Sequence, residues 1–130
     1  MAGLDPLTLD GTRSSPRVEG DPQAGVLRLS GDSYPENTFE FYAPLLRWLS
    51  ALVEHGDGPL RLEIGLSYLN TGSIKSMMDM LDLLEEAHVA GRPVAVVWRC
   101  DPEDERAVEL AGELLEDLTL PWEIARCGAA

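Results

Sequence analysis

The strongest constraint on the fold is an alternation of strand and helix patterns in the second half of the chain. Residues 60–66 alternate apolar and polar side chains, which is typical of a strand with one buried face. Residues 94–98 form a continuous apolar run, which favours a central strand buried on both faces. Between them, helical spacing over 74–90 predicts a crossover helix. Two strands joined in this way are expected to pair in parallel.

Similar patterns extend this arrangement in both directions along the chain. We expect strands near 17–19, 25–30 and 122–125, a helix after residue 37 and another opened by Asp101 and Pro102. Asn37 or Thr38 is the expected cap of the first of these helices. Pro44 lies within its periodic pattern, so the helix either begins near Pro44 or is kinked there.

The predicted architecture is a single α/β domain over 1–130 in the order β-β-α-β-α-β-α-β. Its sheet is expected to be mixed and mostly parallel, with helices covering it. Residues 1–16 are rich in Gly, Pro, Ser, Thr and Asp, and we expect a lead-in there that is either loosely ordered or bound to the edge of the sheet. A chain of 130 residues with 45% hydrophobic side chains is large enough to bury a core.

The charge balance excludes some kinds of partner. The chain has 23 acidic residues against 10 Lys and Arg, a net charge of −13. Such a surface repels phosphate backbones and anionic lipid, so we expect neither nucleic-acid binding nor membrane insertion. It favours a partner with a basic face. No signal peptide or membrane span is apparent, and we expect a cytoplasmic protein.

The residues that usually carry enzyme chemistry are sparse. His55 lies at a predicted helix end and His88 on a predicted helix, and neither is near a nucleophile in sequence. Cys100 and Cys127 have no metal-site spacing, although the strand ends that carry them could be neighbours. No glycine-rich phosphate loop is present. We therefore expect no enzyme activity, no metal and no cofactor.

The segment from Leu69 to Lys75 is the most informative, because it joins a strand to the start of a helix. Free backbone N–H groups at a helix N-terminus attract an anion. A hydroxyl there, on Thr71 or Ser73, has two interpretations. It is either a helix cap, which contributes about 1 kcal/mol, or a phosphorylation site held by the helix end. The residues by themselves leave both open.

Three methionines follow within the same predicted helix. Methionines fill irregular gaps in a core, but they also form adaptable binding surfaces. We expect Met78 to be in the core with Leu81, and Met77 or Met80 to face a partner. An interpretation in which all of them belong to the core stays open.

Several of these segments resemble one family. Gly31-Asp32-Ser33-Tyr34-Pro35-Glu36-Asn37, the run from Tyr68 to Asp79, the run from Leu81 to His88, and Gly91-Arg92-Pro93-Val94 are similar to motifs of the SiaC family of bacterial regulatory phosphoproteins. The resemblance extends over about residues 10–125, with the elements in the same order. It implies a fold like the STAS domain of anti-sigma-factor antagonists.

The resemblance also implies a function and a site. Thr71 is the implied phosphorylation site, with Ser73 as second choice. A dedicated protein kinase would add the phosphate and a PP2C-type phosphatase would remove it. The unphosphorylated form would bind and activate a diguanylate cyclase through a helical region outside the catalytic domain, raising cyclic di-GMP and favouring biofilm formation. An anti-sigma-factor antagonist in a partner-switching system is the alternative.

The residues expected to bind the partner lie at the start of this helix and in the earlier Tyr34 to Asn37 loop. Lys75 lies one helical turn after Thr71 on the same face, so it is expected near the phosphate. The full expected set is Asn70, Gly72, Ser73, Lys75, Met77, Met80, Tyr34, Glu36 and Asn37.

Overall fold

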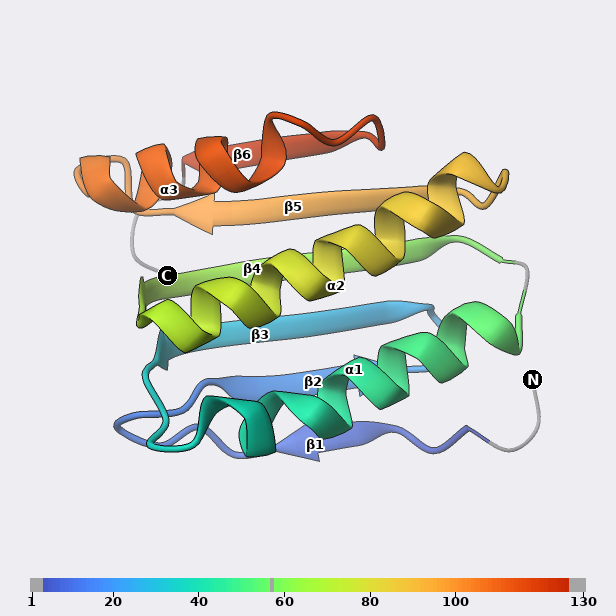
Figure 1. Cartoon of the computed structure of the whole chain (residues 1–130), viewed down its shortest axis with the longest axis horizontal. Coiled ribbons are helices and arrows are strands. Elements are labelled where there is room, and N and C mark those ends of the chain that lie inside the picture. The colour runs from blue at the N-terminus through green and yellow to red at the C-terminus, as the bar shows by residue number, and fades with distance from the viewer. Residues whose placement is uncertain (1–3, 57, 127–130) are drawn as a thin grey trace.

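The computed structural model describes residues 4–56 and 58–126, which form six strands and three helices (Figure 1). The strands are β1 (Leu7–Leu9), β2 (Arg17–Asp21), β3 (Val26–Ser33), β4 (Leu60–Leu69), β5 (Val94–Cys100) and β6 (Trp122–Arg126). The helices are α1 (Thr38–Glu54), α2 (Thr71–Val89) and α3 (Glu105–Leu115). The predicted α/β class and the alternation of its elements are confirmed, with one strand, β1, added at the start.

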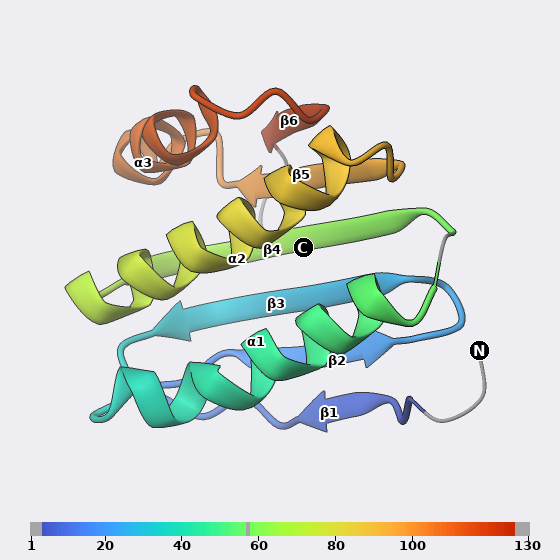
Figure 2. The same ribbon diagram turned by 45° about the vertical axis from the view of Figure 1, so that its right-hand side comes forward.

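The six strands form one sheet whose spatial order is also the order of the sequence. β1, β2 and β3 pair antiparallel, and β3, β4, β5 and β6 pair in parallel. Every crossover therefore steps to the next strand in the same direction. Parallel crossover connections are right-handed, so connections that all step in the same direction place their helices on the same face of the sheet. Accordingly, α1, α2 and α3 all cover one face (Figures 1 and 2).

The core lies between this helical layer and the sheet. Leu29, Ile64 and Trp98 occupy one register row across β3, β4 and β5, and all three are buried. The helices close the core with apolar side chains at helical spacing. Burying a large apolar side chain contributes about 1.5–3 kcal/mol. The buried helix residues include Leu45, Leu49, Leu81, Leu84, Ala111 and Leu115.

Among the described residues, no helix covers the opposite face of the sheet, which corrects one expectation about β5. This strand is an inner strand as expected, paired with β4 on one side and with the edge strand β6 on the other. Val97 on its helix-free face is buried, but Ala95 is half-buried and Arg99 is exposed. The apolar run at 94–98 therefore does not mark a strand with helices on both sides.

Part of the expected loose lead-in is an ordered edge strand. β1 pairs with β2, from Leu7 opposite Gly20 to Leu9 opposite Val18. The indole N–H of Trp48 donates a 2.7 Å hydrogen bond to the Asp5 carbonyl and so ties the lead-in to α1. The Trp48 ring also lies over Gly20, where a Cβ would come within 2.8 Å of it. Of the two expected forms of the lead-in, the edge-bound one is present at Leu7–Leu9, and the contacts of Trp48 help to hold it there.

The helix boundaries partly confirm the predicted caps. Asn37 caps α1, accepting a 3.1 Å hydrogen bond from the Glu40 N–H, and the helix runs through Pro44. The predicted cap of the third helix is wrong, because Asp104 caps α3 and the helix begins at Glu105. Asp101 instead accepts the Glu103 N–H in the turn before it. In the described part of the chain, no helix has the length and apolar character needed to cross a membrane.

Candidate functional site

Two helix N-termini meet at the edge of the sheet where the parallel strands β3 and β4 end. Ser33, the last residue of β3, lies opposite Leu69, the last residue of β4. The Asn70 N–H donates a 2.9 Å hydrogen bond to the Ser33 carbonyl and holds the two strand ends together. α1 and α2 begin within a few residues of this contact. Both helix dipoles therefore direct their positive ends to the same place.

A β-bulge shapes this edge. Gly31 pairs with Leu66, but Asp32 pairs with Tyr68, so β4 has one extra residue between them. A bulge of this kind redirects the side chains that follow it. After the bulge, Ser33 points into the core and the Tyr68 side chain is 55% exposed. Tyr68 makes an edge-to-face contact with Tyr34 from the next loop, with ring centroids 5.7 Å apart.

The cap of α2 is neither of the two hydroxyls that the sequence suggested. Asn70 caps the helix, and its side-chain oxygen accepts a 2.9 Å hydrogen bond from the Ser73 N–H. Thr71 occupies the first helical position and is exposed. Within residues 4–56 and 58–126, the Thr71 hydroxyl makes no hydrogen bond to another residue. This hydroxyl is therefore available at a helix N-terminus.

Ser73, the second choice for phosphorylation, is fully buried. Its hydroxyl donates to the Ser33 carbonyl at 2.9 Å and lies 2.8 Å from the Ser33 hydroxyl. The Ser33 hydroxyl in turn lies 2.6 Å from the hydroxyl of Tyr42 in α1. A kinase cannot reach Ser73 in this position, and the expectation that it takes a phosphate or contacts a partner is wrong. Ser73 instead links β3, α1 and α2.

Proton counting gives a direction to this chain of hydroxyls. The single proton of Ser73 goes to the Ser33 carbonyl, so the Ser33 hydroxyl must donate to Ser73. Tyr42 must then donate to Ser33. Burial raises the pKa of Tyr42, and the hydrogen bonds with Ser33 and Ser73 lower it by less. Tyr42 thus stays a neutral donor.

Gly72 allows α1 and α2 to approach closely at their first turns. A Cβ at Gly72 would lie 2.3 Å from the Thr38 hydroxyl oxygen and 2.8 Å from the Thr38 Cβ. Glycine is therefore required for this packing. Gly72 thus sets how closely the two helix N-termini approach each other beside Thr71.

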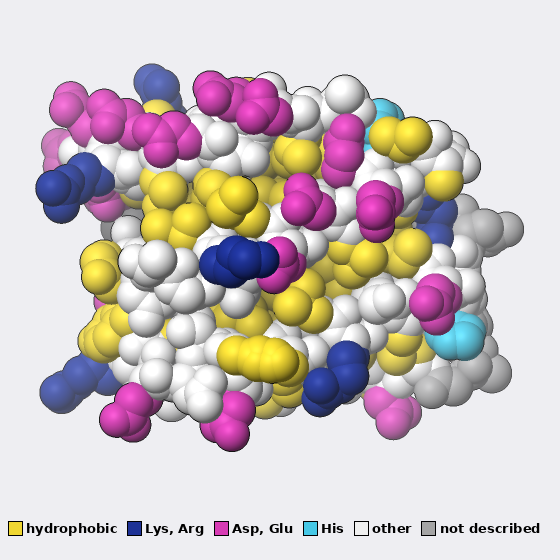
Figure 3. All heavy atoms as spheres, viewed as in Figure 1, with side chains coloured by type: hydrophobic (Ala, Val, Ile, Leu, Met, Phe, Trp, Pro, Cys, Tyr) yellow, Lys and Arg dark blue, Asp and Glu magenta, His cyan; other side chains and the backbone are white. Residues whose placement is uncertain are grey.

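An apolar groove runs between α1 and α2 from this point. Its volume is about 480 Å³, and Phe39, on its α1 side, is 70% exposed. Hydrophobic side chains gather between the helices on this face, while acidic ones concentrate over α3 (Figure 3). The groove reaches the start of α2, because Gly72, the residue after Thr71, is one of its lining residues. The lining residues include Phe39, Ala43, Leu46, Arg47, Gly72 and Lys75.

The methionines of α2, unlike Lys75, depart from what the sequence suggested. Lys75 is exposed and its ammonium group pairs with Asp79 at 2.8 Å, one turn further along α2. Met77 and Met80 are fully buried, whereas Met78 is 47% exposed. The expectation that Met77 or Met80 faces a partner is therefore wrong, and so is the core position of Met78. The buried stripe includes Ser73, so it is rotated relative to the predicted one.

The loop before α1 contributes the remaining expected residues. Tyr34 is exposed and contacts Tyr68, and Glu36 is exposed at the same end of the molecule. Asn37 is committed to capping α1. The structure thus brings this loop beside the start of α2. Sequence reasoning missed Thr38, Phe39 and Tyr68, although the ends of adjacent parallel strands could have indicated their proximity.

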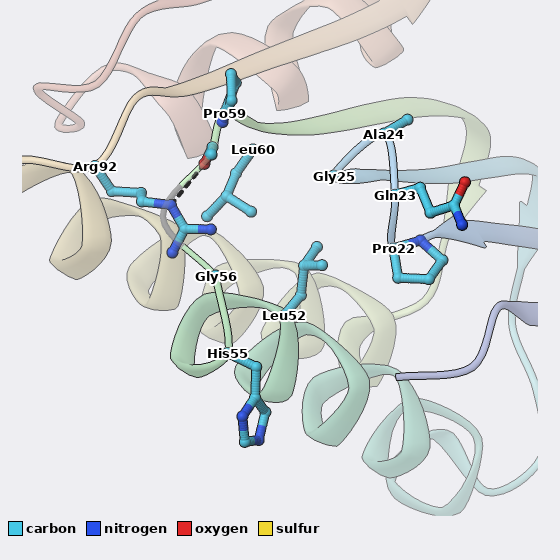
Figure 4. Close-up of a pocket in the computed structure, with 11 residues that line it drawn as sticks. Pro22, Gln23, Ala24, Gly25, Leu52, His55, Gly56, Pro59, Leu60 and Arg92 are labelled. Atoms are coloured by element: carbon cyan, nitrogen blue, oxygen red, sulfur yellow. Dashed lines mark hydrogen bonds between the residues drawn. The ribbon is translucent and has the colours of Figure 1, made fainter. Parts of the chain in front are cut away.

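A second hollow, of about 400 Å³, lies at the opposite end of the sheet between α1 and the β2–β3 turn (Figure 4). Arg92 lines it, but its guanidinium donates to the backbone carbonyls of Gly58 at 2.6 Å and Val53 at 2.8 Å. These carbonyls lie in and after the last turn of α1. We interpret Arg92 as a structural cap of that helix end.

Possible metal ligands and the cysteines were the remaining candidates for a functional site. No group of three or more His, Cys, Asp or Glu side chains in residues 4–56 and 58–126 is arranged to hold a metal ion. Cys100 is buried, and this burial, together with the charge of Asp104, raises the pKa of its thiol. Cys127 lies outside the described residues.

Comparison with known proteins identifies the family. Residues 9–127 match the family described as SiaC family regulatory phosphoprotein. An uncharacterized protein of Pseudomonas aeruginosa is 49% identical over 93% of this chain and 96% of its own length. The solved structure of SiaC of Pseudomonas aeruginosa is 47% identical and superposes with a TM-score of 0.89, covering 95% of this chain and 99% of that one.

A further solved structure contains such a protein with its partner. It is the crystal structure of the diguanylate cyclase SiaD in complex with its activator SiaC from Pseudomonas aeruginosa. This SiaC is 49% identical, with a TM-score of 0.91, and the match covers 93% of this chain and 99% of that one. Fold, motifs and relatives agree, and the chain belongs to the SiaC family of regulatory phosphoproteins.

Proposed function

We propose that this chain is a switch protein that binds and activates a diguanylate cyclase when Thr71 is unphosphorylated. It is itself not an enzyme. A dedicated protein kinase phosphorylates Thr71 and ends the activation, and a PP2C-type phosphatase restores it. The family match and the relative described as an activator of a diguanylate cyclase support this proposal.

The observation that carries the proposal is the position of Thr71. Its hydroxyl is exposed at the first position of α2, and capping is done by Asn70 instead. A kinase can therefore reach Thr71 without unfolding the helix. Its neighbour Gly72 and the nearby Lys75 line the apolar groove between α1 and α2. A change at Thr71 thus acts directly on a surface suited to a partner.

A phosphate on Thr71 acts through charge at the surface. It adds about −1.5 to −2 charges at neutral pH. The positive end of the α2 dipole favours an anion at this place, so the helix should not melt. The added charge and its hydration shell instead lie next to Gly72, which lines the same groove as the exposed Phe39. Partner affinity therefore falls while the fold persists.

The test is a pull-down from host lysate with wild type, Thr71→Ala and Thr71→Asp as baits. A diguanylate cyclase retained by the first two and lost with Thr71→Asp supports the proposal, provided that wild type stimulates the captured cyclase. Thr8→Asp adds the same charge at an exposed position in β1 and should retain the cyclase. Equal capture by Thr71→Asp and wild type would overturn the switch.

The same experiment separates the alternative. A kinase that sequesters a sigma factor, captured without any cyclase, would place this chain among the anti-sigma-factor antagonists. Phosphorylation itself is tested by incubating wild type and Thr71→Ala with the host kinase and locating phosphate by mass spectrometry. Phosphate on Thr71 of the wild type, and none on that peptide of the variant, is the expected result.

A further inference from the structure

Thr71, Lys75 and Asp79 follow one another at intervals of four residues along α2. Residues spaced in this way are neighbours on a helix surface, about 6 Å apart along the axis. The Lys75 ammonium group donates a 2.8 Å hydrogen bond to Asp79 Oδ1. Lys75 therefore has a carboxylate one turn after it and the exposed Thr71 hydroxyl one turn before it.

The ion pair of Lys75 with Asp79 is a weak one. The Lys75 side chain is 71% exposed and that of Asp79 is 42% exposed, so water and salt screen their attraction. The order of the two residues is also the less favourable one. A pair at this spacing is stronger when the acid comes before the lysine, because that order agrees with the helix dipole. Little free energy thus holds Lys75 to Asp79.

A phosphate on Thr71 would offer Lys75 a better partner. It carries about −1.5 to −2 charges at neutral pH, against −1 for a carboxylate. It would also lie four residues before Lys75, which gives the favourable order of acid and lysine. Lysine is a common phosphate ligand, and its long side chain turns easily when it is exposed. Charge and order therefore both favour the phosphate over Asp79.

The loss of Lys75 from Asp79 would change the charge of the groove between α1 and α2. Among the described residues that line this groove, three are charged, namely Arg47, Lys75 and Asp79. While Lys75 and Asp79 are paired, their charges cancel. Once Lys75 turns toward the start of α2, the Asp79 carboxylate lies in the groove without it. Covering an unpaired carboxylate with an apolar surface is unfavourable.

We propose that phosphorylation of Thr71 transfers Lys75 from Asp79 to the phosphate and so leaves an unpaired negative charge in the groove. This inference rests on the proposed function, which supplies the phosphate. No covalent bond changes in the transfer, because one ion pair replaces another. The effect of the phosphate thus extends along the groove to Asp79, about two helical turns beyond its own position.

The test uses the fact that Lys75 is the only lysine of the sequence. The full chain is labelled with ¹³C and ¹⁵N at lysine, so NMR detects one lysine side chain, and phosphothreonine is inserted at Thr71 during synthesis. We expect the Lys75 ammonium signal to shift relative to the unmodified chain. Phosphothreonine inserted at Thr8, an exposed residue of β1, is the matched control and should leave the signal in place.

Asp79→Asn distinguishes a transfer of Lys75 from a mere approach of the phosphate. In the unmodified chain this variant removes the partner of Lys75 and should shift the ammonium signal. In the chain with phosphothreonine at Thr71, Lys75 has already left Asp79, so the same variant should cause no comparable shift. Asp82→Asn removes the same charge from an exposed position in α2 and should not move the signal in either form.

Two results would overturn this proposal. One is an Asp79→Asn shift of equal size in both forms, which would mean that Lys75 stays with Asp79. The other is a Lys75 signal that phosphothreonine at Thr71 does not move. The measurement involves no kinase and no partner. A host kinase that leaves Thr71 unmodified would therefore refute the proposed function without altering this result, so the two failures are distinguishable.

Discussion

Gly72 at the start of α2 lies against Thr38 at the start of α1, with room for a hydrogen atom but not for a methyl group. A Cβ at Gly72 would come within 2.3 Å of the Thr38 hydroxyl oxygen. This contact holds the two helix N-termini side by side. The geometry around Thr71 therefore depends on a residue that lies 34 positions earlier in the chain than Gly72.

Gly72→Ala should destabilise the fold by about 1–3 kcal/mol, because α1 and α2 must move apart. Thr38→Gly should recover most of this loss in the double variant, which urea denaturation of all four proteins can measure as a coupling energy. Gly112 in α3 is the matched control. A Cβ there meets nothing within 4 Å, so Gly112→Ala should stabilise by about 0.5–1 kcal/mol.

The buried hydroxyl chain predicts a ranking of stabilities. Ser33→Ala leaves the Tyr42 hydroxyl buried without its acceptor, at a cost of about 1–3 kcal/mol. Tyr42→Phe removes a donor, but Ser33 keeps Ser73 as its acceptor, so the loss should be smaller. Denaturation curves of the two variants give the comparison. A larger loss for Tyr42→Phe would contradict the order of donors from Tyr42 through Ser33 to Ser73.

The cap of α2 predicts different outcomes at neighbouring positions. Asn70→Ala removes the acceptor for the Ser73 N–H and should cost about 1 kcal/mol of stability. Thr71→Asp should keep the stability within about 1 kcal/mol of wild type, because an acid is favoured in the first turn of a helix. Thermal unfolding of both variants tests this. Unfolding caused by Thr71→Asp would show that charge at this site acts on the fold and not on its surface.

Glu63 predicts a pH dependence of stability. Burial would raise its pKa, but hydrogen bonds from Arg99 and Arg61 and the charge of Arg28 lower it in the fold from 4.5 to about 2. Its ion pairs therefore stabilise fully above the unfolded pKa and are lost as the pH falls toward the folded value. The stability difference between wild type and Glu63→Gln should therefore shrink between about pH 6 and about pH 3. Urea denaturation at both pH values measures it. Glu36→Gln, an exposed change in the loop before α1, should show no such trend.

The fold was predictable because its elements follow local patterns. Alternation over 60–66 and helical spacing over 74–90 depend on residues close in sequence, and both elements are present. The position of Thr71 after a strand was predictable for the same reason. The buried face of α2 was not, because it depends on how the helix packs against α1 and the sheet. That packing buries the polar residues Ser73 and Ser76, which an apolar pattern does not select.

The features missing from the prediction depend on contacts between distant residues. Ser67 is the extra residue in β4, and it can be recognised only from the register of β4 against β3. No local sequence pattern identifies it. The exposure of Phe39 depends on how α1 lies against α2. Likewise, Arg28 and Arg99 lie 71 positions apart and meet through a glutamate on a third strand.

The strand order has a consequence for how the protein is made. Because each strand after β3 pairs with the strand that comes before it in the chain, no pairing has to wait for a distant segment. The elements around Thr71 occupy one continuous stretch, from β3 to α2. The ribosome therefore releases this whole region before β5, α3 and β6. We expect the chain of buried hydroxyls from Tyr42 to Ser73 and the N-termini of α1 and α2 to assemble while the rest of the protein is still being synthesised.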